Sequence, residues 1–214
     1  KSGRTKTRIC IKKLMAIIIW PWYFDGLDPD VNEYLFRTGV TKGRILDLGT
    51  CSGGQAIALA QKGFDVVGTD ISETALLKAN AAARSQELSG NLSFIKDDIL
   101  NTKLEDNSFD YVFDRGCFHC ICYFGLDEYI KSIKKILVPG GKLILKVMSN
   151  EETRFRDFNK FGEVDVPMPE HFDEVLINKA FGKYFDIELI VSSFFYSHRI
   201  NPPAKAKLAT MVVR

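Results

Sequence analysis

Short apolar runs alternate with helical stretches from residue 43 onward. The first run, residues 44–48, predicts a buried strand, and the apolar positions of residues 54–62 then fall on one side of a helix that Gly63 ends. Further elements are predicted as strands at 64–69, 92–95, 109–113 and 142–148, and as helices after Ser72 and over 126–137. This alternation predicts a parallel sheet with helices on both faces.

The C-terminal part departs from this alternation. Residues 151–170 are charged and contain two prolines, which predicts an irregular insertion before a helix near 171–182. Strands at 185–192 and 207–213 follow, and we expect them to be antiparallel neighbours because the loop between them is too short for a parallel crossover. The expected fold is therefore α/β, with a Rossmann-like, seven-stranded, mostly parallel sheet and an antiparallel C-terminal strand.

The chain has 214 residues, 46% of them hydrophobic, which suits one α/β domain. We assign residues 43–214 to this domain and residues 1–42 to an N-terminal extension or lid. The apolar stretch of residues 14–24 is interrupted by Pro21; it is too short to span a membrane, and no small-residue cleavage site follows it. The basic residues before it are more simply a solvated terminus than an arm for phosphate or anionic lipid.

Charge and cysteine content narrow the class of protein. Lys and Arg number 29 against 27 Asp and Glu, a net charge of +2 that gives no global field for a polyanion, so a nucleic acid partner is not expected. The five cysteines are odd in number and three crowd into residues 117–122, which indicates a reducing, cytoplasmic compartment. That cluster lacks the second, distant ligand pair of a structural zinc site, so no metal is expected.

The strongest chemical signal is the segment Asp47-Leu-Gly49-Thr-Cys51-Ser-Gly53-Gly54, which lies directly between a predicted strand and a predicted helix. Glycines in such a turn let the backbone bend tightly and let a ligand approach closely. A dinucleotide-binding turn requires glycine at position 51, and Cys51 breaks that pattern. Asp47 would repel a pyrophosphate, but it would attract the amino group of a methionine moiety.

This turn resembles the first motif of the class I S-adenosylmethionine-dependent methyltransferases, an acid and an aliphatic residue followed by Gly-x-Gly-x-Gly, with Cys51 in place of the middle glycine. Asp70 follows Gly49 by about twenty residues, where the resemblance implies hydrogen bonds to the ribose hydroxyls. Asp98 would accept from the adenine amino group, with Ile99 packed nearby. The closing antiparallel pair also resembles these enzymes and differs from a dehydrogenase. The cofactor contacts implied in this way are those of Asp47, Gly49, Thr50, Cys51, Gly53, Asp70, Ile71, Asp98, Ile99 and Asp114.

The fourth predicted strand ends in Asp114-Arg115-Gly-Cys-Phe-His119, at the edge where open α/β sheets bind ligands. Together with Trp20-Pro-Trp22-Tyr23-Phe24, this segment resembles small-molecule methyltransferases of the thiopurine, thiol and tellurite-resistance type. We expect substrate contacts from Trp22, Tyr23, Arg115 and His119. His119 is also the candidate catalytic base, although a satisfied structural histidine is an equally good interpretation.

These observations predict an enzyme that transfers a methyl group from S-adenosylmethionine to a small-molecule acceptor, with S-adenosylhomocysteine as the product. Such a transfer is an in-line displacement, in which the enzyme aligns the acceptor and excludes water. Two alternatives stay open: a protein or RNA methyltransferase, which the basic N-terminal residues would favour, and a cofactor-binding protein without catalysis. The sequence also leaves the oligomeric state open.

Overall fold

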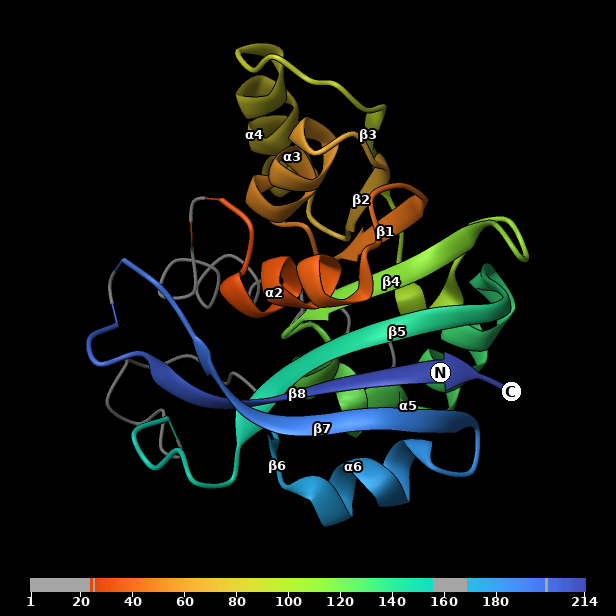
Figure 1. The fold of residues 1–214 in the computed structure, drawn as a ribbon, viewed down its shortest axis with the longest axis vertical. Helices are drawn as coiled ribbons and strands as arrows, with labels where there is room; N and C mark the ends of the chain where they lie inside the picture. The colour runs from red at the N-terminus through yellow and green to blue at the C-terminus, as the bar shows by residue number, and fades with distance from the viewer. Residues whose placement is uncertain (1–23, 25, 156–168, 199) are drawn as a thin grey trace, which may run out of the picture.

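One mixed sheet organises the chain in the computed structural model, which describes residues 24, 26–155, 169–198 and 200–214 (Figure 1). The strands are β1 Arg44–Leu48, β2 Asp65–Asp70, β3 Leu92–Lys96, β4 Phe109–Arg115, β5 Leu137–Ser149, β6 His171–Phe172, β7 Phe185–Phe195 and β8 Ala204–Val213. Their order is β3-β2-β1-β4-β5-β8-β7, and the short β6 pairs with β5. The first five strands pair in parallel, whereas β8 runs antiparallel to both β5 and β7.

This topology confirms the predicted Rossmann-like, mostly parallel sheet with its antiparallel C-terminal strand, and the two-residue β6 adds an eighth strand to the seven predicted. β1 has the predicted bounds, and the four residues after Arg44 are buried. The chain order reverses between β1 and β4, which are neighbours in the sheet. Ligands bind at such a reversal in open α/β sheets, so the carboxyl ends of β1 and β4 mark the place to look for a site.

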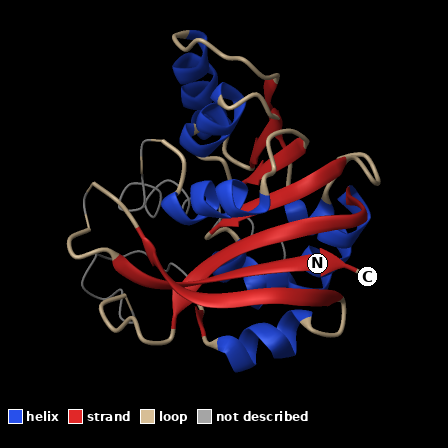
Figure 2. Ribbon diagram, in the orientation of Figure 1, coloured by secondary structure: helices blue, strands red, loops and turns tan. Residues whose placement is uncertain are grey.

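Helices cover both faces of the sheet, as the alternation predicted (Figure 2). They are α2 Pro29–Thr38, α3 Gly54–Gln61, α4 Glu73–Arg84, α5 Phe118–Ile136 and α6 Glu174–Phe181, with a short 3-10 helix, η1, at Ile99–Asn101. Successive side chains of β1 point to opposite faces. Ile45 joins an apolar cluster with α2 and α3, and Leu46 joins a second cluster with α5 and α6.

Helix α2 lies within the predicted N-terminal extension. The helix begins where two residues favour a start. The Asp28 side chain accepts from a backbone amide of the first turn, and Pro29 occupies the first helical position. Val31 and Leu35 are buried in the cluster that includes α3. Residues 29–38 therefore pack on the sheet, and the proposal of a lid concerns only the chain before Asp28.

Helix α5 begins at Phe118, so the predicted start at Leu126 is wrong. The Asp114 carboxylate accepts from the amides of the first turn, which caps the helix at this earlier point. Gly125 departs from helical geometry, with φ −175° and ψ 58°, and interrupts the helix.

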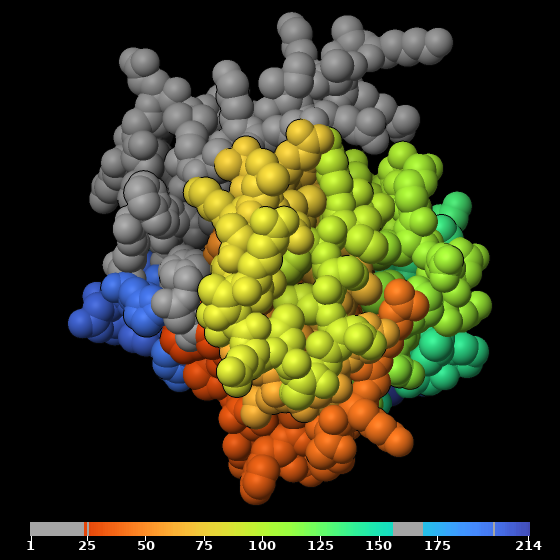
Figure 3. All heavy atoms as spheres, turned by 90° about the horizontal axis from the view of Figure 1, so that it is seen from above, coloured from red at the N-terminus to blue at the C-terminus, as the bar shows by residue number. Residues whose placement is uncertain are grey.

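Helices α4 and α2 are exposed on the face of the molecule that is seen from above. In that view α4 (yellow) occupies the centre and α2 (orange) lies below it (Figure 3). Within the described ranges, no helix has both the length and the apolar character needed to cross a membrane.

Candidate active site

The turn between β1 and α3 is held by hydrogen bonds to β2. The Thr50 amide donates to the Thr69 carbonyl (2.8 Å), and the Cys51 amide donates to the Asp70 carboxylate (3.1 Å). Gly53 has φ 84°, and a Cβ there would stand 2.8 Å from the Phe94 ring. Only glycine fits at position 53, because both the backbone conformation and the space exclude a side chain.

Cys51 takes the place of the middle glycine and adopts the backbone that glycine would, with φ 55°. A non-glycine residue in this left-handed region is uncommon and carries strain. Burial raises the pKa of the Cys51 thiol to about 11. The thiol is therefore uncharged at neutral pH, and its small size allows the turn to keep the shape that glycine gives it.

Asp47 lies at the end of β1, on the sheet face that carries α3, with 2% of its surface exposed. Its carboxylate accepts from the Thr50 hydroxyl (2.6 Å). Burial raises the pKa of Asp47 to about 6, although the Thr50 hydroxyl, the Ala56 amide and the charge of Arg115 act in the opposite direction. A buried carboxylate with so few partners is suited to receive a cation.

Asp70 ends β2, next to Asp47 in the sheet order. One carboxylate oxygen accepts from the Cys51 amide, and the other accepts from the Ser72 amide at 2.8 Å. Burial raises the pKa of Asp70, partly opposed by these amides. Each oxygen of a carboxylate has two acceptor positions, so this orientation is compatible with a further hydrogen bond to each.

Asp98 follows β3, the next strand outward. Its carboxylate accepts from the Leu100 amide (3.1 Å) and caps η1. Ile99 is buried in the cluster beneath α5, and Ile71, beside Asp70, is half-buried. The predicted acids thus stand at the ends of three neighbouring strands, which is where the sequence placed them.

Asp114, at the end of β4, is fully buried and already satisfied. It accepts from the amides of Cys117 (2.7 Å) and Phe118, and from the Tyr129 hydroxyl (2.8 Å). Burial raises its pKa to about 7, against the effect of these donors. Asp114 therefore caps α5. Its predicted contact with the cofactor stays a prediction. The cap also fixes the position of Cys117. A Cβ placed on Gly49 would lie only 3.1 Å from the Cys117 Cβ, so a side chain at position 49 would be crowded.

His119 lies in the first turn of α5 and is 5% exposed. Its Nδ1 accepts from the Met148 amide (2.9 Å), and its ring meets the Phe195 ring edge-on. Burial, together with the neighbouring His171, lowers the pKa of His119 to about 3, so the ring is neutral and carries its proton on Nε2. This geometry suits a hydrogen-bond donor and disfavours a base, because Nδ1 already accepts from the Met148 amide and Nε2 carries the proton.

Arg115 ends β4 on the opposite face from Asp114. Its Nε donates to Asp28 (2.8 Å) and another guanidinium nitrogen donates to the Tyr196 carbonyl (2.7 Å). The guanidinium also lies over the rings of Phe24 and Phe195. Arg115 therefore binds protein groups on two sides, and its predicted substrate contact stays a prediction.

Comparison with known proteins decides the family of this site. Residues 40–163, more than half of the chain, match the methyltransferase domain family. The chain belongs to this family. The match confirms the predicted S-adenosylmethionine-dependent methyltransferase class and its cofactor.

Two curated relatives and one solved structure are similar to this chain. Thiocyanate methyltransferase 1 of Arabidopsis thaliana is 35% identical over 129 residues, which are 59% of this chain and 55% of that protein. A 2-heptyl-1-hydroxyquinolin-4(1H)-one methyltransferase of Mycobacteroides abscessus is 26% identical over 178 residues, 83% of this chain and 74% of that protein. The crystal structure of a SAM-dependent methyltransferase from Methanosarcina mazei has the same fold, with a TM-score of 0.71 and 23% identity over 88% of this chain and 98% of that one.

The ends of β1, β2 and β3 in this methyltransferase fit the cofactor that the family uses. The turn at Gly49 and Gly53 has the left-handed backbone that lets a ligand approach. Three carboxylates with acceptor capacity, Asp47, Asp70 and Asp98, line neighbouring strand ends. These groups match a ligand that offers an ammonium, ribose hydroxyls and an amino group as donors.

Sequence reasoning missed the charged side chains that meet beside the ends of β4 and β5. Lys146 lies within the apolar run of β5, and Asp28 precedes α2. A lysine in the middle of a buried strand was a signal that a partner had to exist. Its partner is 118 residues away in the chain, so no local pattern named it.

Some predicted residues of the methyltransferase fall outside this description. Trp22 and Tyr23, like Cys10 and the basic N-terminal residues, lie outside the described residues. The four cysteines within the described ranges, Cys51, Cys117, Cys120 and Cys122, are free thiols. Among the described side chains, no group of His, Cys, Asp and Glu is arranged to hold a metal ion.

Proposed function

We propose that this chain transfers a methyl group from S-adenosylmethionine to a small-molecule acceptor. The observation that carries the proposal is that described residues just before α2 contact the start of α3, next to the turn that suits the cofactor. The Phe24 carbonyl oxygen lies 3.1 Å from where a Cβ on Gly54 would stand. The Gln55 side chain bonds the Gly26 carbonyl and the Asp28 amide, each at 2.7 Å. A site bordered in this way by its own chain favours a small acceptor over a macromolecule.

The relatives support the same class of acceptor. Their names give thiocyanate and a hydroxyquinolone as the molecules that they methylate. Both are small, and their reacting groups differ in kind. We therefore propose the class of acceptor and not its identity.

On the cofactor side, the roles follow from the chemistry of each side chain. Bound S-adenosylmethionine supplies the sulfonium methyl group. Asp47 would hold the methionine ammonium, and the Thr50 hydroxyl orients its carboxylate. Asp70 would accept from the ribose hydroxyls, since the Cys51 amide fixes its direction, and Asp98 would accept from the adenine amino group.

On the acceptor side, we propose contacts from Arg115 and from Trp22 and Tyr23. His119 would act as a hydrogen-bond donor through Nε2, because Nδ1 is occupied by the Met148 amide. A thiolate acceptor needs little help from a base near neutral pH, which agrees with a histidine that stays neutral. The free thiols support our expectation of a cytoplasmic protein.

The test is a transfer assay with S-adenosylmethionine that carries a labelled methyl group. The acceptors are thiocyanate, thiophenol and 2-heptyl-1-hydroxyquinolin-4(1H)-one, with total RNA and a mixed protein extract as macromolecular alternatives. We expect label in a small product and an equal amount of S-adenosylhomocysteine. Asp70→Ala is the control variant, because it should abolish the signal at limiting cofactor.

Two results would overturn the proposal. Label found only in RNA or protein would make the chain a macromolecular methyltransferase. Binding of S-adenosylmethionine without any S-adenosylhomocysteine, across every acceptor class, would make it a binding protein without catalysis.

A further inference from the structure

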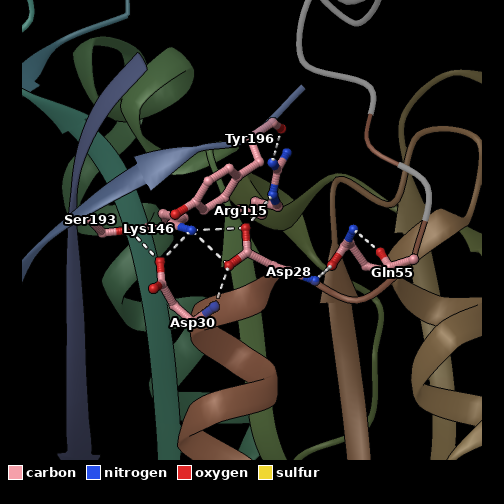
Figure 4. Close-up of polar contacts among 8 residues, drawn as sticks. Asp28, Asp30, Gln55, Arg115, Lys146, Ser193 and Tyr196 are labelled. Carbon is pink, nitrogen blue, oxygen red and sulfur yellow. Dashed lines mark hydrogen bonds and ion pairs between the residues drawn. The ribbon is translucent and has the colours of Figure 1, made fainter. Parts of the chain in front are cut away.

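Four charged side chains from distant parts of the chain meet at the ends of β4 and β5, on the face that α2 covers (Figure 4). Lys146 Nζ lies 2.6 Å from a carboxylate oxygen of Asp28 and 2.6 Å from one of Asp30. Arg115 Nε donates to the same Asp28 carboxylate, and the Ser193 hydroxyl donates to Asp30. The side chains of Lys146 and Asp28 are completely buried.

Stability alone does not account for this charge cluster. Removing two charges from water costs several kcal/mol per ion, and a well-packed apolar pair is often as stable as a buried ion pair. Burial by itself would raise the pKa of Asp28, yet Lys146 and Arg115 hold it below its usual value. The carboxylate therefore stays ionised, and its position is fixed by two cations from two strands. Buried charges of this kind are best explained by the geometry that they impose.

The cluster fastens two segments to the strand ends. The first is the chain from Phe24 to Asp28, whose Asp28 end is held by both cations. The second follows β7, where Arg115 holds the Tyr196 carbonyl at 2.7 Å. The two segments also meet each other, because the Phe24 ring stacks on the His198 ring with centroids 5.8 Å apart.

The Phe24 segment and the end of β7 both border the strand ends that carry the predicted site. The Phe24 carbonyl lies against Gly54, at the end of the cofactor turn. On the other side, a Cβ on Gly116 would stand 3.2 Å from the His119 ring and 3.5 Å from the Phe195 ring. The rings of Phe24, Phe195 and His198 therefore lie together beside Arg115, and we call them the acceptor wall. The acids that suit the cofactor lie at the ends of β1, β2 and β3.

We propose that Asp28, Arg115 and Lys146 form a clasp that positions the acceptor wall, so that binding and alignment of the acceptor depend on it and cofactor binding does not. This inference rests on the proposed function, because it assigns the clasp to the acceptor side of the same site. Lys146 is a positioning residue in this account, since it acts through the segments that it holds.

The test compares Lys146→Met with Lys142→Met. Lys142 lies on the same strand and points to the same face, and it pairs with Glu188 at 2.8 Å in a more exposed setting. With thiophenol as the acceptor, Lys146→Met should raise KM for thiophenol by about tenfold or more, because a displaced wall loses alignment. The Kd of S-adenosylhomocysteine should change by less than about twofold, and Lys142→Met should match the native protein in both quantities.

A double variant, Asp28→Asn with Lys146→Met, separates positioning from stability. Lys146→Met leaves the carboxylates of Asp28 and Asp30 with Arg115 as the remaining cation of the cluster, whereas neutralising Asp28 as well leaves one carboxylate and one cation. We expect the double variant to recover most of the melting temperature lost in Lys146→Met, while KM for thiophenol stays raised. Recovery of both quantities would assign the cluster to stability and overturn the proposal.

Amide hydrogen exchange in the presence of S-adenosylhomocysteine gives a readout that needs no turnover. Exchange at residues 26–30 and 196–198 should quicken in Lys146→Met and stay native in Lys142→Met. Unchanged exchange, or an equal loss of cofactor affinity, would overturn the clasp. Failure of the native protein to methylate any small acceptor would instead overturn the proposed function, and the exchange result would still decide whether the clasp holds these segments.

Discussion

The affinity for S-adenosylhomocysteine should fall as pH drops through about 6, and Asp47 should be the cause. Burial raises the pKa of this carboxyl from 3.8 to about 6 in the cofactor-free protein. The ligand's ammonium stays charged between pH 5 and 7, so a proton and the ammonium compete for the same carboxylate. The apparent Kd then scales as one plus the ratio of protonated to ionised Asp47, which gives about a tenfold loss of affinity from neutral pH to pH 5.

Unfolding at acid pH does not explain such a loss through Asp47. Its pKa is higher in the folded than in the unfolded chain, so between about pH 4 and 6 the folded state binds more protons at this residue. Asp47 therefore contributes stability at low pH that is lost as pH rises through about 6. The affinity has the opposite dependence, because ligand binding needs the ionised form.

Calorimetric titration at pH 5, 6 and 7 and constant ionic strength measures this effect. Asp47→Asn is the matched control, since a carboxamide oxygen can still accept from the Thr50 hydroxyl. The pKa of Asp70 is also raised, so some pH dependence should remain in both proteins. The prediction concerns the difference between them: identical pH profiles for native and Asp47→Asn protein would refute the assignment of Asp47 to the ammonium.

Three further predictions concern single features of the site. Asp98→Ala should weaken S-adenosylhomocysteine binding by about tenfold, the worth of one hydrogen bond, and a loss as large as that of Asp70→Ala in the same titration would count against the single adenine contact. His119→Gln should lower kcat by less than about tenfold, because a carboxamide can replace both the acceptor and the donor; a loss of 10²-fold or more would restore the base. Deletion of residues 1–24 should slow methyl transfer with little change in melting temperature, and a fall of many degrees would make the segment part of the core and not a lid.

The parts of the fold that could be predicted are those with local causes. Apolar runs of strand length gave β1 and its neighbours, and Ser72 caps α4 as its position before Glu73 indicated. The acids at the strand ends could be identified because a carboxylate at the end of an apolar run is unfavourable without a partner or a ligand. Such signals need only a few adjacent residues, so the sequence alone displays them.

The parts that could not be predicted depend on distant contacts. Asp114 has the residue type and position of a ligand-binding acid, and only the folded chain shows that it caps α5; its contact with the cofactor stays a prediction. The partners of Lys146 are Asp28 and Asp30, which lie in the segment that we predicted to be an N-terminal extension or lid. For His119 the sequence left a catalytic base and a structural histidine as alternatives, and the bond from the Met148 amide to Nδ1 could not be foreseen. For Lys146 and His119 the partner is distant in the chain, so the neighbouring residues do not reveal it.

We propose that the strand ends carrying Gly49, Asp70 and Asp98 bind the cofactor. Titration of S-adenosylhomocysteine into the native protein and Asp70→Ala tests it most directly, with circular dichroism to show that both are folded. Two hydrogen bonds to a charged acceptor are worth roughly 3–6 kcal/mol together, so the account predicts at least about a hundredfold loss of affinity in Asp70→Ala. An affinity that stays within about threefold of native in a folded Asp70→Ala protein would contradict the account, because a ribose held by this carboxylate cannot lose it without cost.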